Sequence, residues 1–459
     1  MAAFFGAEEI WNGHAAGDDT EPVILAGVYQ SNGGEYESER EFRHSLKELS
    51  ELAKACHMDP VHTLTQQLSQ IDRALYVGSG KAEEIAVFVK EMEAQRVIFN
   101  DTLSPSQIRN LQKCLKVPVV DRTRLILDIF EQRARTKEAR LQVELAKLQY
   151  LKPRLTGLWE TQNRQGGASG AQSSKGEGEK QLELDRRTID MRLSELRREL
   201  KAVIRERETR RKKRRNSSLP LVALVGYTNA GKSTIMNALI SAYASDELSE
   251  KKNVFEADML FATLDTTIRR ITPEKGRDFL LSDTVGFIRH LPTFLIEAFR
   301  STLEEVTEAD LLLQVVDASD EYACKHVEVT KETIADLHAG HIPMVTVFNK
   351  ADLCDPALEH PRRGRRESSV DEEQNENIYI SAREPDSIKL LVSVILEKLE
   401  RKNLSREFLI PYDKGQVQAY LMQNARIDTL DYRADGIFIK ANCTAAVSEK
   451  ADRMLRCSG

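Results

Sequence analysis

Eight residues near the middle of the chain, from Gly226 to Ser233, have the types and spacing of a phosphate-binding loop. They read Gly-Tyr-Thr-Asn-Ala-Gly-Lys-Ser and follow an apolar run, 221–225, that has the character of a buried strand. Glycine lets backbone amides face a phosphate, Lys232 adds a positive charge, and the Ser233 hydroxyl can bind Mg²⁺. The pattern therefore predicts that the phosphates of a nucleotide bind to Gly226, Tyr227, Thr228, Asn229, Ala230, Gly231, Lys232, Ser233 and Thr234.

A second motif indicates that the base is guanine. The tetrapeptide Asn-Lys-Ala-Asp at 349–352 ends another apolar run, and open α/β sheets bind ligands at that end of their strands. The Asp352 carboxylate can accept hydrogen bonds from guanine N1–H and from its exocyclic amine, a pair of donors that adenine lacks. We expect the guanine contacts to come from Asn349, Lys350, Asp352, Ser381, Ala382 and Arg383.

Two segments between these motifs could respond to the γ-phosphate. Residues 283–286, Asp-Thr-Val-Gly, supply a carboxylate that can hold Mg²⁺ through water and a glycine amide for the phosphate. Segment 261–270 contains three threonines, one of which would complete the Mg²⁺ shell with GTP and release it after hydrolysis. The predicted phosphate-binding group therefore also includes Asp283, Thr284, Val285 and Gly286.

The elements that hold these motifs alternate between apolar strands and helical segments. This alternation predicts a P-loop GTPase domain with a doubly wound, mostly parallel α/β sheet over residues 218–401. A polar stretch at 361–377 breaks the pattern, and we interpret it as an exposed insertion. Strands are expected at 221–225, 279–282, 311–316, 344–348 and 378–380.

The N-terminal part of the chain predicts a separate small α/β domain. Residues 1–20 are expected to be disordered, and 21–121 alternate between helix and strand, which favours a parallel sheet. One expected strand, 74–77, leads into Gly78-Ser79-Gly80-Lys81, which resembles a phosphate loop. That tetrapeptide lacks the six-residue span and the hydroxyl after lysine, so we favour a strand-to-helix turn over a second nucleotide site.

Residues 122–217 have the pattern of two long helices that form an antiparallel hairpin arm. Its tip, about 160–180, is rich in Gly, Ser and Gln, and such a sequence cannot bury itself. Segment 205–215 carries eight basic and two acidic residues, which is a strong local positive charge. After the nucleotide domain, residues 402–459 are expected to form a small C-terminal α/β module.

Composition excludes a membrane-spanning protein and favours several domains. The chain has 459 residues, 41% hydrophobic and 30% charged, with a net charge of −6 and no apolar window long enough to cross a bilayer. Its first twenty residues contain no Lys or Arg, so we expect a cytoplasmic protein, with a membrane-associated fraction as an alternative. The six cysteines are scattered, which indicates neither a disulfide framework nor a thiolate zinc site.

The motifs GYTNAGKST, LFATLD, DTVGFIRHLP and NKAD together resemble the HflX family of translation GTPases. The resemblance covers about residues 22–400 and includes NDTLSPSQIRNLQ, DRTRLILDIFEQRARTKEARLQVELAKLQY, PRLTG and GEKQLELDRR, with a weaker match at IPYDKG. It implies a GTP-dependent factor that binds the large ribosomal subunit and separates the subunits of stalled or idle ribosomes. We also expect the protein to act as a monomer. The arm and its tip would be directed toward the peptidyl-transferase region. DNA is not an expected partner.

The resemblance also implies roles for single residues. Thr263 becomes the favoured Mg²⁺ ligand beside Ser233, with Thr266 and Thr267 left open and Asp283 acting through water. The predicted catalytic residues are Lys232, Thr263 and Gly286. The tip has Lys175 and Glu177 where related sequences carry an Arg-Gly-Pro-Gly-Glu run. By charge and analogy, rRNA contacts are expected at Arg164, Lys175, Arg186, Arg187, Arg210, Arg211, Lys212, Lys213, Arg214 and Arg215.

Phe287 follows Gly286, where many GTPases carry the glutamine that positions the attacking water. Phenylalanine cannot hydrogen-bond water, so we expect slow hydrolysis until the ribosome orders the switch segments and supplies the missing contact.

Three other functions compete with ribosome splitting. A ribosome-assembly GTPase would use the same basic helix and the same nucleotide domain. A signalling switch would bind a protein effector, and its basic run would only be a solvated helix face. An ATP-driven RNA remodeller would use the loop at Gly78–Lys81.

Overall fold

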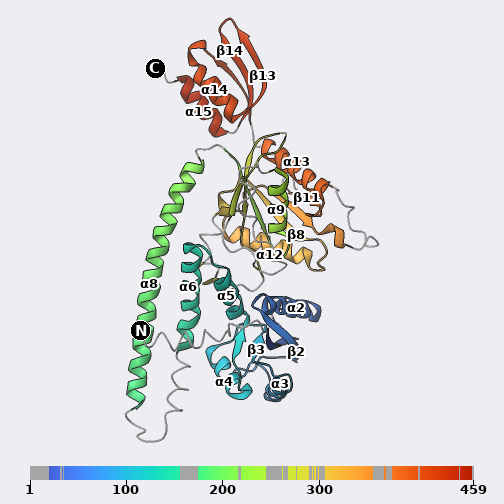
Figure 1. Ribbon diagram of the computed structural model, residues 1–459, viewed down its shortest axis with the longest axis vertical. Coiled ribbons are helices and arrows are strands. Elements are labelled where there is room, and N and C mark those ends of the chain that lie inside the picture. Colours follow the sequence, from blue (N-terminus) through green and yellow to red (C-terminus); the bar gives the residue numbers. More distant parts are fainter. Residues whose placement is uncertain are drawn as a thin grey trace. The chain divides into compact units, whose positions relative to one another are not determined.

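The computed structural model of the protein divides into two compact units. The first comprises 1–204 with 258–264 and 290–300, and the second comprises 205–257, 265–289 and 301–459. Figure 1 labels the elements of both. The structure describes residues 20–31, 34, 36–155, 174–215, 219–243, 261, 267–274, 276–288, 292, 294–295, 298, 305–354, 366–368, 375–401, 404–443 and 445–456.

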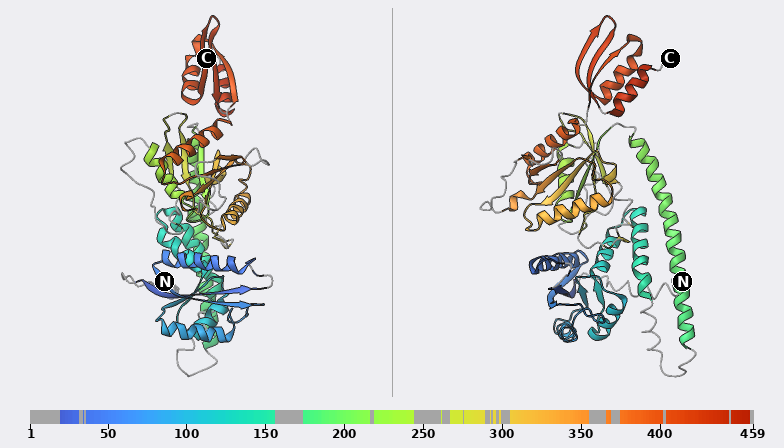
Figure 2. Two further views of the ribbon diagram at one scale, coloured as in Figure 1. Left: turned by 90° about the vertical axis from the view of Figure 1, so that its right-hand side faces the viewer. Right: turned by 180° about the vertical axis from the view of Figure 1, so that it is seen from behind.

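A four-stranded parallel sheet begins the first unit, which confirms the predicted α/β domain (Figure 1). The strands lie in the order β2-β1-β3-β4. Helix α2 packs on one face, while α3 and α4 pack on the other (Figure 2). The bounds are β1 Glu21–Gln30, α2 Glu39–Ala55, β2 Met58–Leu68, α3 Ser79–Glu91, β3 Arg96–Phe99, α4 Pro105–Leu115 and β4 Val119–Asp121.

The prediction of a strand at 74–77 is wrong, and the strand found in the sheet is β2. The Asp72 carboxylate accepts hydrogen bonds from the backbone N–H groups of Ala74 and Leu75, at 2.7 and 2.6 Å, which closes a tight turn. Strand β2 lies at an edge of the sheet and alternates between buried and exposed positions, so its sequence lacks a long apolar run.

The short glycine segment Gly78–Lys81 starts a helix. Gly78 is the N-cap of α3, and its N–H donates to the Gln66 side-chain oxygen at 2.9 Å. The Lys81 ammonium pairs with Glu84, one turn farther along the same helix, at 2.7 Å. The segment therefore follows a turn rather than a strand.

In the part of the arm that the structure describes, the first of the two predicted long helices is divided into separate helices. Helix α5 (Arg122–Arg133) ends before α6 (Lys137–Leu151), because the Thr136 hydroxyl accepts a hydrogen bond from Ala139 N–H and caps a new helix. After the short helix η1 (Lys152–Arg154), α8 runs from Ser174 to Arg215. Helix α8 is joined to α6 by the ion pair between Arg192 and Glu144, and to η1 by the ion pair between Asp190 and Lys152. The predicted tip lies largely outside the described residues.

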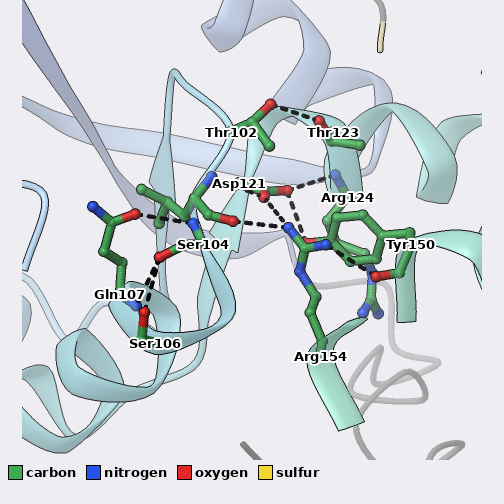
Figure 3. Close-up of polar contacts among 10 residues, drawn as sticks. Thr102, Ser104, Ser106, Gln107, Asp121, Thr123, Arg124, Tyr150 and Arg154 are labelled. Carbon is green, nitrogen blue, oxygen red and sulfur yellow. Dashed lines mark hydrogen bonds and ion pairs between the residues drawn. The ribbon is translucent and has the colours of Figure 1, made fainter. Parts of the chain in front are cut away.

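A buried carboxylate, Asp121, ties the end of this arm segment to the sheet (Figure 3). It ends β4 and accepts four hydrogen bonds, from Arg124 N–H at 2.8 Å, Tyr150 Oη at 2.9 Å, Arg154 Nη2 at 3.1 Å and Leu103 N–H at 3.2 Å. Burial raises the pKa of Asp121, and the Arg154 charge opposes that rise. Arg154 also lies 3.5 Å over the Tyr150 ring. The C-terminal end of α6 is thus fixed to the end of β4 and to Leu103, in the segment that follows β3.

The second unit contains a seven-stranded sheet in the order β10-β11-β9-β8-β5-β7-β6, antiparallel only at β6 and β10. Buried clusters on both faces confirm the doubly wound sheet, with α9 and α13 on one side and α12 on the other. The bounds are β5 Leu221–Gly226, α9 Lys232–Tyr243, β6 Thr267–Ile271, β7 Phe279–Asp283, β8 Leu311–Asp317, α12 Ala323–Asp336, β9 Met344–Asn349, η2 Ala351–Leu353, β10 Arg366–Ser368, β11 Asn375–Tyr379 and α13 Pro385–Arg401.

The interpretation of 361–377 as an exposed insertion is partly wrong, because two pieces of this segment belong to the sheet. Arg366–Ser368 pairs antiparallel with residues 376–378 at the edge of the sheet. The residues between these pieces, 369–374, lie outside the described part of the chain.

The C-terminal residues form the expected small α/β module. Its antiparallel sheet has the order β12-β14-β13, and both helices cover one face through a core that includes Phe408, Leu421 and Ile439. Among the described residues, no helix is long and apolar enough to cross a membrane. The bounds are β12 Leu404–Ile410, η3 Tyr412–Lys414, α14 Gly415–Asn424, β13 Arg426–Arg433, β14 Gly436–Cys443 and α15 Ala445–Arg456.

Replacing Asp121 with asparagine should loosen the end of α6. The new amide group would face two of the four donors, so local opening should become about 10- to 100-fold more frequent. Hydrogen exchange of peptides covering 119–155 measures this, and peptides of the nucleotide domain should be unchanged. Asp190→Asn, which loses only an exposed ion pair, is the matched control. Equal exchange in the two variants would contradict the role assigned to Asp121.

Candidate nucleotide site

The predicted phosphate loop joins β5 to α9, with two glycines in left-handed conformations. Gly226 has φ +143°, and a Cβ there would lie 2.2 Å from the Val315 carbonyl oxygen in β8. Gly231 has φ +91°, and its Cβ would lie 2.2 Å from Asn349 Nδ2. Only glycine fits either position, because any side chain would overlap the neighbouring strand or the Asn349 side chain.

Lys232 lies inside this loop at the first position of α9. Its ammonium donates to the carbonyl oxygens of Gly226 and Tyr227 at 3.0 and 2.7 Å, and only 7% of the residue is exposed. Burial lowers the pKa of Lys232 to about 8, with the nearby Asp283 carboxylate opposing the shift. A phosphate anion would be a stronger partner for this ammonium than two neutral carbonyls.

Ser233 and Asp283 bring oxygen atoms together beside the loop. The Ser233 hydroxyl donates to Asp283 Oδ2 at 2.9 Å, and Asp283 is fully buried at the end of β7. The next residue, Thr284, donates its hydroxyl to the Leu224 carbonyl at 2.6 Å, which joins β7 to β5. Hydroxyl and carboxylate oxygens at the N-terminus of a helix fit the ligand preference of Mg²⁺.

Gly286 packs directly on the loop. A Cβ at Gly286 would lie 2.9 Å from the Thr228 methyl carbon and 3.0 Å from Lys232 Nζ. Val285 is buried beside it. The structure therefore brings the segment Asp283–Gly286 against the phosphate loop.

Of the three threonines considered for Mg²⁺, only Thr267 lies in the described part of the chain. It begins β6 and pairs with Asp283 in the antiparallel ladder. Thr263 and Thr266 lie outside the described residues.

Phe287 is part of the apolar core. Its ring is buried in a cluster with Val225, Val306 and Leu312. Its N–H donates to the Gly226 carbonyl at 3.0 Å, and its carbonyl accepts from Thr228 N–H at 2.8 Å. The residue that follows Gly286 is thus attached to the phosphate loop by its backbone, with its side chain turned into the core.

Asn349 connects the phosphate loop with the two segments expected to contact the base. Its Nδ2 donates to the Ala230 carbonyl at 3.0 Å, and its Oδ1 accepts from Ala382 N–H at 3.0 Å. The side chain is buried, so these bonds are shielded from water. One amide group therefore fixes the phosphate loop, the end of β9 and the loop after β11 relative to one another.

The other expected guanine residues lie around this junction. Lys350 has a left-handed backbone (φ 61°), and its ammonium pairs with Asp317 at the end of β8 at 2.7 Å. Asp352 is half-buried in η2. Ser381 is buried, and its hydroxyl accepts from the N–H of the exposed Arg383 at 3.4 Å.

Three family models match consecutive parts of the chain. They are described as GTP-binding GTPase N-terminal (residues 43–131), GTP-binding GTPase Middle Region (133–214) and 50S ribosome-binding GTPase (221–350). The protein named GTPase HflX of Caldanaerobacter subterraneus subsp. tengcongensis is 40% identical over 94% of this chain and 93% of that protein. The chain belongs to the HflX family of GTPases.

A second HflX relative and one solved structure are also similar to this GTPase. GTPase HflX of Escherichia coli K12 is 37% identical over 91% of this chain and 92% of that protein. A crystal structure of a GTP-binding protein from Sulfolobus solfataricus in complex with GDP is similar over 82% of this chain and 99% of that chain. The identity is 22% and the TM-score 0.42.

The basic residues expected to contact rRNA are only partly described in this HflX-family chain. Arg186 and Arg187 are exposed on α8. Lys175 and residues 210–215 belong to the same helix, but their side chains are not described. Arg164 lies outside the described residues. The structure therefore brings the nucleotide motifs together, and it places the basic candidates other than Arg164 along one helix.

Two residues of the site are missing from the sequence prediction. Asp317 holds the Lys350 ammonium, and His326 stacks on the Tyr227 ring with a centroid separation of 3.8 Å. The Tyr227 ring thus points into the domain, and the backbone of Tyr227 forms part of the phosphate loop. Neither partner stands at a fixed spacing from a motif, so only the folded arrangement identifies it.

Replacing Asn349 with aspartate should weaken nucleotide binding about 10- to 100-fold. Aspartate keeps the acceptor for Ala382 but replaces the donor to Ala230 with a charged oxygen, so two acceptors would face each other. Equilibrium binding of fluorescent GDP measures the effect. Asn110→Asp breaks the same kind of bond, from Asn110 Nδ2 to the Ala74 carbonyl, in the other unit and should leave binding unchanged. Wild-type affinity in Asn349→Asp would refute the junction role.

Proposed function

We propose that this HflX-family GTPase binds GTP between the phosphate loop and the Asn349 junction. The backbone of Gly226–Thr234 and the Lys232 ammonium hold the phosphates, and the Gly286 amide contacts the γ-phosphate. Asp352 accepts from guanine N1–H and its amine, Lys350 lies along the base, and the Ser381–Arg383 loop contacts the guanine oxygen. The observation that carries this proposal is the pair of Asn349 hydrogen bonds that joins these loops.

Mg²⁺ fits the oxygen atoms beside the loop. Ser233 and Thr263 would ligate it directly and Asp283 through water, as the Ser233–Asp283 contact at 2.9 Å supports. When bound, the ion neutralises charge on the β- and γ-phosphates.

Hydrolysis by the free protein should be slow. Lys232, Thr263 and Gly286 hold the transferring phosphoryl group, but the buried Phe287 ring has no polar atom for the attacking water. We infer that a partner orders the switch segments and supplies the missing contact, a gain of about 10³- to 10⁵-fold in comparable systems.

The partner in this proposal is the ribosome, chiefly its large subunit. The match of residues 221–350 to the model described as 50S ribosome-binding GTPase supports this choice. So does the positive charge of segment 205–215, because Lys and Arg neutralise RNA phosphates. The protein would act as a cytoplasmic monomer, with Arg164, Lys175, Arg186, Arg187 and residues 210–215 on rRNA, and would separate stalled or idle ribosomes into subunits.

Asp352→Asn should change the preferred base of the bound nucleotide from guanine to xanthine. Asparagine loses an acceptor for the guanine amine but offers a donor to the oxygen that xanthine carries at that position, so GTP affinity should fall at least 100-fold and XTP affinity should rise. Competition binding with both nucleotides measures the change. Asp386→Asn, on an exposed residue at the start of α13, should leave both affinities unchanged. Loss of both nucleotides without a switch would remove Asp352 from base recognition.

Sedimentation of intact ribosomes tests the splitting function. With wild-type protein, GTP and a non-hydrolysable analogue should both convert the ribosome peak into free subunits, and GDP should not. Lys232→Ala should lose the activity, whereas Lys389→Ala, on the exposed face of α13, should keep it. If the protein co-sediments only with isolated large subunits and intact ribosomes remain whole, a ribosome-assembly GTPase becomes the better conclusion.

A further inference from the structure

Tyr227, the second residue of the phosphate loop, stacks face to face on His326 of α12. The ring centroids are 3.8 Å apart and the planes differ by 10°. Both residues are about 95% buried, Tyr227 with 6% and His326 with 5% of its surface exposed. The contact therefore lies inside the domain, between the loop and a helix that is far from it in the sequence.

The Tyr227 backbone is the point at which the loop meets both Lys232 and the segment after Gly286. Its carbonyl accepts from Lys232 Nζ at 2.7 Å. The residues on either side of it, Gly226 and Thr228, bond to the two backbone groups of Phe287. Because the ring and this carbonyl belong to one residue, holding the ring in place also restricts the movement of the Tyr227 backbone and of these bonds.

His326 is itself firmly held. Its backbone N–H donates to the Tyr322 carbonyl at 3.0 Å, and its backbone carbonyl accepts from the Thr330 hydroxyl at 2.7 Å. Its Nδ1 lies 3.7 Å from a carboxylate oxygen of Asp320, in the turn before α12. Because only 5% of its surface is exposed, the imidazole is a buried partner for the Tyr227 ring rather than a mobile surface group.

The loop needs such a partner because holding its backbone in this conformation costs conformational free energy. Gly226 and Gly231 have positive φ, and so does Asn229 at 58°. Glycine has the largest backbone freedom to lose, and a loop that is already ordered spends less free energy on ordering when its ligand binds. Tyr227 is the only aromatic residue between 226 and 233, so its ring is the largest surface by which this segment can be held.

We propose that His326 is a positioning residue for nucleotide binding, which holds the phosphate loop in its binding conformation by stacking on Tyr227. His326 has no contact with the nucleotide in this proposal and acts through the loop backbone. The inference rests on the proposed nucleotide site and adds a residue of α12 to the groups that set its affinity. A shift of the first turn of α12 would reach the phosphates by this route.

His326→Ala should weaken GDP binding about two- to tenfold, the value of one aromatic stack. KM for GTP should rise by the same factor, with kcat within twofold of wild type. Amide exchange of residues 226–231 in nucleotide-free protein should become faster. His326→Phe keeps a flat ring and should restore both affinity and protection. His341→Ala, at an exposed histidine beyond the end of α12, controls for loss of an imidazole.

A double-mutant cycle with Tyr227→Leu separates this role from general destabilisation. The effects of Tyr227→Leu and His326→Ala should be less than additive, because either change removes the same stack. The inference is overturned if His326→Ala binds GDP like wild type, if His326→Phe is as weak as His326→Ala while both remain folded, or if the two effects add. Lys232→Ala is the reference: wild-type binding in that variant would instead overturn the nucleotide site itself.

Discussion

The close approach of the phosphate loop to strands β8 and β9 is the constraint on which the nucleotide domain depends. At Gly226 a Cβ would lie 2.2 Å from a carbonyl oxygen of β8, and at Gly231 it would lie 2.2 Å from the Asn349 amide at the end of β9. The missing side chains let Asn349 reach the Ala230 carbonyl and, with its other atom, the backbone of Ala382. The spacing of the glycines is therefore a packing requirement as well as a means of exposing amides to phosphate.

The same closeness explains the chemistry around Phe287. A residue whose N–H and carbonyl are both bonded to the phosphate loop has its backbone fixed, and the apolar ring then completes the core beneath α12. A polar side chain buried at this position would lack partners and would cost free energy. Core packing requires an apolar side chain at position 287, whereas positioning of the attacking water requires a polar one. This chain has the apolar side chain. The polar contact for the attacking water has to come from another group.

The sequence predicts the parts of the fold that local spacing controls. Gly226–Ser233, Asp283–Gly286 and Asn349–Asp352 are short motifs at the ends of apolar strands, so the pattern contains both their chemistry and their place in the sheet. The wrong expectations, and the one contact that the sequence prediction missed, concern features that tertiary contacts decide. Strand β2 is an edge strand with alternating polarity, the break before Thr136 depends on one capping hydroxyl, and the Tyr227–His326 stack joins residues with no fixed spacing.

The Asp121 cluster gives a physical reason for the joint presence of three motifs outside the nucleotide domain. Leu103, Asp121 with Arg124 and Tyr150, and Arg154 belong to three separate motifs that resemble the HflX family, and all of them meet at one buried carboxylate (Figure 3). A buried charge is tolerated only when every partner is present, because the loss of one leaves an uncompensated group in the interior. The three motifs therefore have to be retained together. Their common product is a fixed position of η1, at the end of α6, relative to the sheet of the same unit.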